Sequence, residues 1–137
     1  MALLRKTLKD GNASLTKSRL IVFDLLDNRD PQSMNDLVMK SKGKLDKASL
    51  YRTINLYERL GVINRVNFGF KYKVELSDSF SDHHHHLTCI SCGRIINTEE
   101  DHRLEDIIEE LASSYSFKPL SHQLEIQGLC EICLTKA

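Results

Sequence analysis

Residues 46–76 read DKASLYRTINLYERLGVINRVNFGFKYKVEL, and this stretch decides the fold of the first half of the chain. Asp46 is a favourable N-cap residue and Gly61 stands where helices commonly end in the left-handed conformation, so we predict a helix between them. Its apolar residues recur at helical spacing and form one stripe: Leu50, Ile54, Tyr57 and Leu60. Residues 62–67 and 71–76 then predict two strands of a β-hairpin around a glycine turn.

Two shorter helices are predicted before this stretch. Thr16 can cap a helix whose apolar residues extend to Leu26, and Ser33 with Asp36 resembles a capping box that opens a helix toward Lys42. Three helices followed by a hairpin is the order of a winged helix-turn-helix, in which the third helix enters the major groove of DNA. The candidate DNA contacts are Lys47, Tyr51, Arg52 and Arg65. Such a basic face can also be merely solvated, and the same order of elements serves protein-binding modules.

The charge of the chain is divided unevenly. Its 137 residues include 19 Lys plus Arg and 19 Asp plus Glu, a balance that on its own argues against a nucleic-acid partner. Divided after Leu76, however, the first part has 15 basic and 8 acidic residues, net +7, and the second has 4 and 11, net −7. All 6 His and all 4 Cys lie beyond residue 82. We therefore predict two domains, a basic DNA-binding domain over residues 1–76 and a metal-binding domain over residues 77–137.

The apolar runs of the sequence are short. None approaches the ~20 residues that a membrane-spanning helix needs, and the first residues lack a signal-peptide core. We expect a cytoplasmic protein with no membrane partner.

Two Cys-x-x-Cys pairs stand out in the acidic part. Cys89 and Cys92 form the first pair, followed by Gly93, and Cys130 and Cys133 form the second. Each pair can present two thiolates to one ion, so together they predict a closed, structural four-sulfur Zn²⁺ site. Disulfides and a thioredoxin-like redox pair are the alternatives, which a cytosolic location and the absence of a βαβ pattern disfavour.

A run of four histidines precedes the first cysteine pair. If the run is extended, side chains alternate, so His84 and His86 lie on one face and His83 and His85 on the other. This alternation predicts two separate metal sites rather than one four-histidine site. Glu105 and His122 could complete one of the histidine pairs, although each residue alone is unremarkable.

The rest of the acidic part predicts a small α+β domain. Short strands are expected at residues 87–89 and 95–96, a helix over residues 101–114, and an alternating strand over residues 121–128. The helix residues expected to point inward are Leu104, Ile107, Ile108 and Leu111.

These residues together resemble the ferric uptake regulator family of bacterial metal-responsive repressors. The resemblance covers nearly the whole chain. The matching motifs are Leu15-Thr16-x-x-Arg19, Leu50-Tyr51-Arg52, Leu60-Gly61, Tyr72 to Leu76, His83 to Gly93, and Gly128 to Cys133. It implies an α+β protein in which an N-terminal winged helix-turn-helix DNA-binding domain is followed by a small α/β dimerisation domain.

The resemblance also implies partners and ligand sets. A homodimer would bind a palindromic double-stranded operator when a regulatory metal is present, and Tyr51 and Arg52 would meet the DNA. The four cysteines match the family's structural zinc site. One further metal site of the dimerisation domain would comprise His83, His85, Glu105 and His122. A hinge site that links the domains and senses metal would comprise Glu75, His84 and His86.

One departure bears on the regulatory metal. Family members that sense iron usually carry a histidine just before the second helix, whereas residues 30–33 read DPQS. Water, Asp30, Asp82, His102 or another acid must then complete the hinge site. Nitrogen and oxygen donors accept Fe²⁺, Zn²⁺ and Mn²⁺, and the presence of Glu75 favours Fe²⁺.

Other functions fit parts of the pattern. A zinc uptake regulator-like sensor lacks the same histidine but commonly uses a cysteine near the hinge. A peroxide-sensing regulator favours Asp at the position of Glu75. A zinc hydrolase lacks support from any HExxH-type helix, and a metal-storage module would leave the basic half as mere surface. We therefore expect a metal-responsive repressor that senses Fe²⁺, and not an enzyme.

Overall fold

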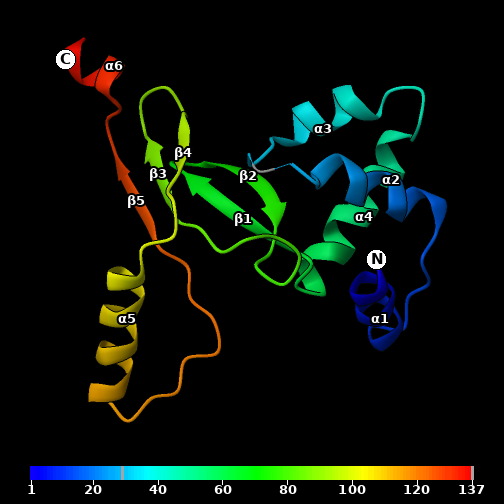
Figure 1. Ribbon diagram of the computed structural model, residues 1–137. Helices are drawn as coiled ribbons and strands as arrows, with labels where there is room; N and C mark the ends of the chain where they lie inside the picture. Colours follow the sequence, from blue (N-terminus) through cyan, green and yellow to red (C-terminus); the bar gives the residue numbers. More distant parts are fainter. Residues whose placement is uncertain (29, 137) are drawn as a thin grey trace. The chain divides into compact units, whose positions relative to one another are not determined.

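The computed structural model describes residues 1–28 and 30–136, and the chain divides into two compact units (Figure 1). The first unit is Met1–Asp82 and the second is His83–Ala137. No helix in the described part of the chain combines the length and the apolar character that crossing a membrane requires.

The first unit has four helices followed by a hairpin. The elements are α1 (Ala2–Asp10), α2 (Lys17–Leu26), α3 (Met34–Ser41), α4 (Lys47–Arg59), β1 (Ile63–Phe68) and β2 (Lys71–Leu76). The predicted caps are present, because Thr16 accepts a hydrogen bond from the backbone of Arg19 and Asp46 accepts one from the backbone of Ser49. Ser33 and the N3 carboxylate of α3 form a complete capping box. Helices α2, α3 and α4 and the hairpin confirm the winged-helix prediction.

The hairpin forms the wing. Strands β1 and β2 pair antiparallel from Ile63 opposite Leu76 to Phe68 opposite Lys71, which leaves a two-residue turn. The first turn residue, Gly69, has φ +59°, a conformation that L residues with a side chain rarely adopt. Gln32 adds an isolated bridge to the middle of β2, since it exchanges backbone hydrogen bonds of 2.9 and 2.8 Å with Val74.

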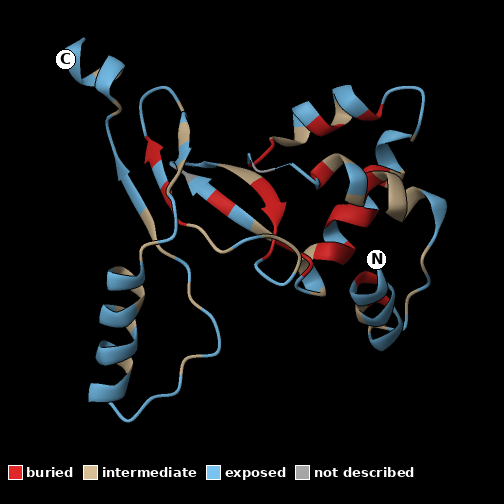
Figure 2. Ribbon diagram, viewed as in Figure 1, coloured by how far each residue is buried: buried red, intermediate tan, exposed pale blue. Residues whose placement is uncertain are grey.

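Helix α1 was not predicted from the sequence, yet it contributes to the core of the first unit. Leu4 and Leu8 are fully buried, one turn apart on the same side of the helix. Figure 2 shows buried residues on all four helices and on the wing strands of this unit. Leu4 and Leu8 form one hydrophobic cluster with the other buried residues of this unit: Val22, Leu26, Leu37, Leu50, Ile54, Leu56, Tyr57, Val62, Ile63, Val74 and Leu76.

The second unit is a three-stranded sheet with two helices. Its elements are β3 (His86–Cys89), β4 (Ile95–Asn97), α5 (His102–Ser114), β5 (Glu125–Gly128) and α6 (Glu131–Thr135). Strand β3 is central, antiparallel to β4 and parallel to β5. The predicted order of two strands, a helix and a strand is confirmed. The last strand is shorter than predicted, because only residues 125–128 pair with β3, and α6 was not predicted.

The prediction that the apolar face of α5 points inward holds only in part for this chain, because Leu104 and Ile108 are partly buried but the other two predicted residues are exposed. Ile107 and Leu111 are 60% and 61% exposed, and no residue of α5 is buried. Among the side chains that the structure describes, Cys89 is the only buried apolar residue of the second unit. The helical periodicity identified an apolar face correctly, but the described part of the second unit leaves Ile107 and Leu111 on that face exposed. The second unit therefore lacks an aliphatic core of its own.

Candidate metal centres and nucleic-acid interface

The four cysteines come together in the second unit. Their Sγ atoms all lie within 4.8 Å of one another, and those of Cys92 and Cys130 are 3.7 Å apart. Four thiolates at about 2.3 Å from a tetrahedral zinc ion would be separated by about 3.8 Å. All four are free thiols, so the disulfide alternative does not describe this structure. The donor set and its spacing fit the predicted structural zinc ion, with no ligand position left open.

Local backbone structure positions these thiols. Gly93, at φ +75°, lets the chain turn back so that its N–H donates to the carbonyl of Cys89 at 2.9 Å. The N–H of Ile90 donates to Gly128 at 2.9 Å, which joins the first knuckle to the segment that leads into Cys130. Hydrogen bonds from the backbone of Cys130 and Cys92 lower the pKa of the Cys89 thiol to about 6. Cys89 thus favours the thiolate form that binds metal, whereas, despite a hydrogen bond with Ser91, burial and hydrogen bonds to the other thiols raise the pKa of Cys133 to about 11.

A second cluster brings three imidazoles to one carboxylate. The Nε2 atom of His85 lies 2.7 Å from Oε1 of Glu105, that of His83 lies 3.3 Å from the same oxygen, and that of His122 lies 2.9 Å from Oε2. The Nε2 atoms of His83 and His122 are 3.0 Å apart. The sequence predicted these four residues as one site only through the family resemblance, and the structure brings them together. Their four ligand atoms lie within 4.8 Å of one another.

The electrostatics of this cluster suit a divalent cation. Burial alone would raise the pKa of Glu105, but the hydrogen bond with His85 and the charges of His122 and His83 outweigh burial and lower that pKa. The carboxylate is therefore ionised and the histidines converge on it through one type of ring nitrogen. Three imidazoles and a carboxylate accept Zn²⁺, Fe²⁺, Mn²⁺ and similar ions.

The alternation predicted for the histidine run is confirmed within the second unit. The rings of His83 and His85 are in edge contact at 4.6 Å between centroids, and those of His84 and His86 are paired likewise at 4.8 Å. The two pairs are thus separate. Glu75, the third residue of the predicted hinge site, lies on β2 in the first unit.

The segment in which iron-sensing relatives usually carry a histidine has a structural role here. The side chain of Gln32 donates to the carbonyl of Leu25 at 2.6 Å and accepts from Nζ of Lys40 at 2.5 Å. It ties the end of α2 to α3 instead of presenting a donor nitrogen. His102, another candidate to complete the hinge site, is 87% exposed and lies 3.9 Å from Glu100.

The polar face of α4 carries three of the four predicted DNA contacts. Tyr51 is 38% exposed, with Nζ of Lys47 5.9 Å from the centre of its ring, and Arg52 donates to the hydroxyl of Ser49 at 3.1 Å. The fourth predicted contact, Arg65 on β1, already has a carboxylate partner. It pairs with Glu58 at 2.6 and 2.9 Å.

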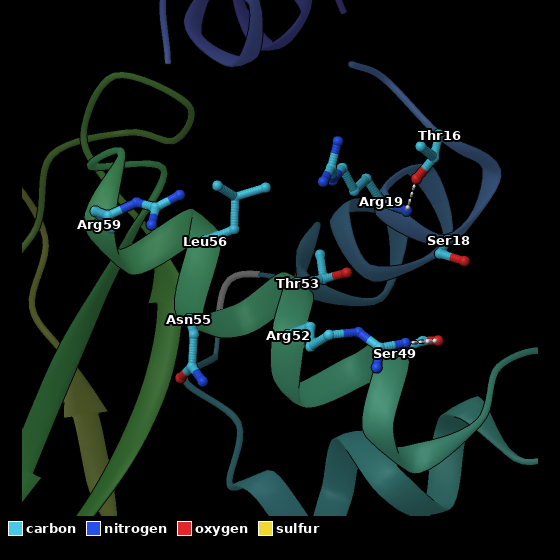
Figure 3. Close-up of a pocket in the computed structure, with 9 residues that line it drawn as sticks. All are labelled: Thr16, Ser18, Arg19, Ser49, Arg52, Thr53, Asn55, Leu56 and Arg59. Carbon is cyan, nitrogen blue, oxygen red and sulfur yellow. Dashed lines mark hydrogen bonds between the residues drawn. The ribbon is translucent and has the colours of Figure 1, made fainter. Parts of the chain in front are cut away.

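Two basic residues near this face were not predicted as contacts. Arg19 and Arg59 line a groove beside Arg52 in the first unit (Figure 3). The seven-residue spacing from Arg52 to Arg59 places both on one side of a helix, and this was the signal in the sequence that could have revealed the second.

A winged helix with an exposed basic recognition face, joined to a unit that carries a four-thiol cluster and a histidine–carboxylate cluster, defines a metal-responsive DNA-binding transcriptional regulator rather than an enzyme. Comparison with known proteins identifies the particular family. The chain belongs to the ferric uptake regulator family, whose model matches residues 11–127.

Individual relatives agree with this assignment. The chain is 33% identical over 138 residues to the ferric uptake regulation protein of Bacillus subtilis, a match that covers 95% of this chain and 91% of that protein. The crystal structure of the Vibrio cholerae ferric uptake regulator is similar at a TM-score of 0.71 and 28% identity, covering 92% of this chain and 98% of the other. The Helicobacter pylori regulator shares the fold at a TM-score of 0.78 and 24% identity, covering 97% and 90%.

Proposed function

We propose that this regulator is a cytoplasmic, Fe²⁺-responsive repressor that binds a palindromic operator as a homodimer. The observation that carries the proposal is the separation of the four-histidine run into two imidazole pairs, which supplies nitrogen ligands to two sites besides the four-thiol cluster. Nitrogen and oxygen donors without thiolate suit Fe²⁺. The 33% identity to a ferric uptake regulation protein also supports iron.

The regulatory site in this proposal comprises Glu75, His84 and His86. Glu75 contributes a carboxylate from the last part of the wing, and the two histidines contribute imidazoles from the second unit. A divalent cation held at this site would supply the positive charge that attracts the carboxylate and the two imidazoles. Because the donors come from both units, filling the site favours one arrangement of the winged helices, and operator binding changes only by the difference in metal affinity between arrangements.

The other metal sites have supporting roles. Cys89, Cys92, Cys130 and Cys133 hold structural Zn²⁺ in the proposal. The site of His83, His85, Glu105 and His122 steadies the second unit, since Glu105 on α5 and the histidines that precede β3 and β5 are otherwise joined only by hydrogen bonds and ion pairs. Lys47, Tyr51, Arg52 and Arg65 contact DNA, the last after exchanging Glu58 for a phosphate.

A zinc-sensing regulator is the second candidate. The observation that favours it is the segment at Pro31 and Gln32, which offers no imidazole, so the hinge site has three donors from the chain and one position for water. Four-coordinate geometry of this kind suits Zn²⁺. Mn²⁺ would require additional oxygen donors.

Operator binding at controlled free metal concentrations tests the proposal. Duplexes selected by the metal-loaded protein from a random-sequence pool serve as operator, and binding is titrated anaerobically with Fe²⁺, Zn²⁺ and Mn²⁺. We expect Glu75→Gln and His86→Ala to remove metal stimulation while zinc content and helix content stay unchanged. Glu110→Gln, an exposed carboxylate of α5, is the matched control.

Two results would revise the proposal. If both hinge variants keep metal-stimulated binding of wild-type strength, the assignment of Glu75, His84 and His86 is wrong. If an operator reporter in cells follows the zinc supply and ignores iron, Zn²⁺ replaces Fe²⁺ as the regulatory metal. Buffered concentrations are required because most nitrogen and oxygen sites bind Zn²⁺ more tightly than Fe²⁺ whatever the physiological metal.

A further inference from the structure

A groove in the first unit lies between the start of α2 and the length of α4. Its volume is about 490 Å³. Figure 3 shows the residues that line it. The lining residues are Thr16, Ser18, Arg19, Ser49, Arg52, Thr53, Asn55, Leu56 and Arg59. We call it the arginine groove.

The arginine groove has positive charge, and no carboxylate is among the residues that line it. Its lining includes three guanidinium groups, those of Arg19, Arg52 and Arg59, and no Asp or Glu. Within the described residues none of the three forms an ion pair, whereas Arg65 pairs with Glu58 and Arg103 pairs with Asp101. The groove therefore differs from the paired arginines elsewhere among the described residues, because no carboxylate lies in direct contact with its cations; Asp46 approaches Arg52 only through the shared hydroxyl of Ser49.

Most of the guanidinium N–H donors in the groove remain available. Arg19 donates from one Nη atom to the backbone carbonyl of Ser14, and Arg52 donates from one Nη atom to the hydroxyl of Ser49. Each guanidinium has five N–H donors, so these bonds orient the groups while leaving donors for a ligand. Planar guanidinium groups beside hydroxyl and amide groups are the chemistry that recognises phosphate oxygens.

The arginine groove is also preorganised and adjoins the predicted base-reading face. The phenol of Tyr57, fully buried, donates to the backbone carbonyl of Arg19 at 2.6 Å, which fixes the first turn of α2 against α4. Arg52 belongs both to the groove and to the face of α4 that exposes Tyr51. If α4 occupies the major groove of DNA, a DNA strand that borders this major groove would thus pass beside the arginine groove.

We propose that the arginine groove holds backbone phosphates of duplex DNA, with Arg19 and Arg59 as phosphate contacts in addition to Arg52. This inference rests on the proposed function, since it requires that the first unit binds DNA. It assigns to the groove a positioning role that is independent of operator sequence, because phosphate contacts fix register and orientation without reading bases.

The salt dependence of binding tests the inference. The full-length protein, loaded with Fe²⁺ anaerobically, is titrated with mixed-sequence duplex DNA over a range of salt concentrations. Each lost phosphate contact should reduce the slope of log affinity against log salt by about 0.9. Arg19→Ala and Arg59→Ala are each expected to show this loss, and the double variant about twice the loss. Arg103→Ala, which removes the same charge from the second unit, should keep the wild-type slope.

Two further variants and one further probe remove ambiguity. Arg19→Lys retains the charge and should retain most of the slope, so a structural defect in Arg19→Ala is separable from a lost contact. The side chain of Arg59 makes no hydrogen bond or ion pair with any described residue, so Arg59→Ala tests the groove with little structural risk. In parallel, inorganic phosphate is titrated as a free anion into the wild-type protein, and the stability of the protein is measured.

The outcomes distinguish the inference from the function on which it rests. If wild-type protein binds no duplex with any metal, the proposed function fails. If wild-type protein binds and both alanine variants keep its salt slope, only the groove assignment fails. Stabilisation of the wild type by inorganic phosphate, together with unchanged DNA slopes in the variants, would instead assign the groove to a free anion and overturn the backbone proposal.

Discussion

Removing one cysteine ligand should unfold the second unit and leave the first folded. The perturbation is Cys92→Ser, which leaves three thiolates and an alcohol in place of the four-thiol cluster. Cys92 is an exposed side chain, so the substitution itself costs little packing. Its effect reports on the metal site and not on a core.

The expected magnitude follows from the burial of side chains in each unit. Leu, Ile, Val and Tyr side chains form the buried cluster of the first unit, whereas Cys89 is the only buried apolar side chain that the structure describes in the second. Structural zinc contributes about 10–16 kcal/mol to the folding of small metal domains. Whole domains are stable by only about 5–15 kcal/mol. Loss of the ion therefore removes as much free energy as the fold of the second unit has.

Hydrogen exchange measured by mass spectrometry can follow the two units separately. Peptides covering β3 and β5 should lose their protection in Cys92→Ser, and peptides covering α2 and α4 should keep theirs. Ser91→Ala, a change at the adjacent position that is not a ligand, should leave both patterns intact. Metal analysis shows whether the variant lacks zinc. If a zinc-free variant keeps its protection from hydrogen exchange in β3 and β5, the reasoning from burial is refuted.

Three other predictions concern the first unit. Tyr57→Phe leaves the carbonyl of Arg19 without its donor and should lower the free energy of unfolding by about 1 kcal/mol, seen as roughly fivefold faster exchange of the slowest α4 amides, whereas Tyr51→Phe should change nothing. Leu8→Ala should lower the stability of this unit by about 2–5 kcal/mol, measured by denaturant titration, because Leu8 is fully buried; a cost below about 1 kcal/mol would mean that α1 is not part of the core. The side-chain and backbone hydrogen bonds of the N-cap serine lower the pKa of Asp36 from its usual 3.8, so its contribution is complete above that value and is lost as the pH falls through the lowered pKa. The stability of Asp36→Asn should fall less steeply with acid than that of wild type, and parallel pH profiles would contradict this.

The elements that the sequence predicted well are those with signals at both ends. Helix α4 has an aspartate cap at Asp46 and a glycine of φ +71° at Gly61. Three residues of the predicted apolar stripe, Leu50, Ile54 and Tyr57, are buried, and Leu60 is partly buried. The C-cap of helix α1 is Gly11, but this glycine has φ −86° instead of the left-handed conformation. No side chain caps it, and only Leu4 and Leu8 show helical spacing, so its presence depends on packing against residues far along the chain. The sequence in and around α1 therefore could not predict that packing.

The candidate metal ligands likewise divide into those that the sequence pattern predicted and those that it did not. Two-residue alternation along an extended run predicted which histidines pair, and the ring contacts agree. The convergence of Glu105 and His122 on His83 and His85 could not be derived from spacing, since these residues lie on separate elements whose approach depends on the tertiary fold. The family resemblance supplied that set.

The apolar face of α5 illustrates what helical periodicity in a sequence cannot predict. Helical spacing shows that Ile107 and Leu111 share a face, but it cannot show whether the surface that covers the face belongs to the same chain. A dimer interface and an internal core have the same pattern.

The division of the four-thiol cluster between two distant cysteine pairs has a consequence for synthesis. All residues of the buried core cluster precede Ser77, so the first unit can fold while the ribosome is still translating the second. The zinc site cannot close until Cys133 has been added, 41 residues after Cys92. At about 5–20 residues per second, the first cysteine pair waits about 2–8 s for the second. During this interval a nascent chain has a folded winged helix but an open pair of thiols, so its maturation depends on zinc supply and on the thiols staying reduced.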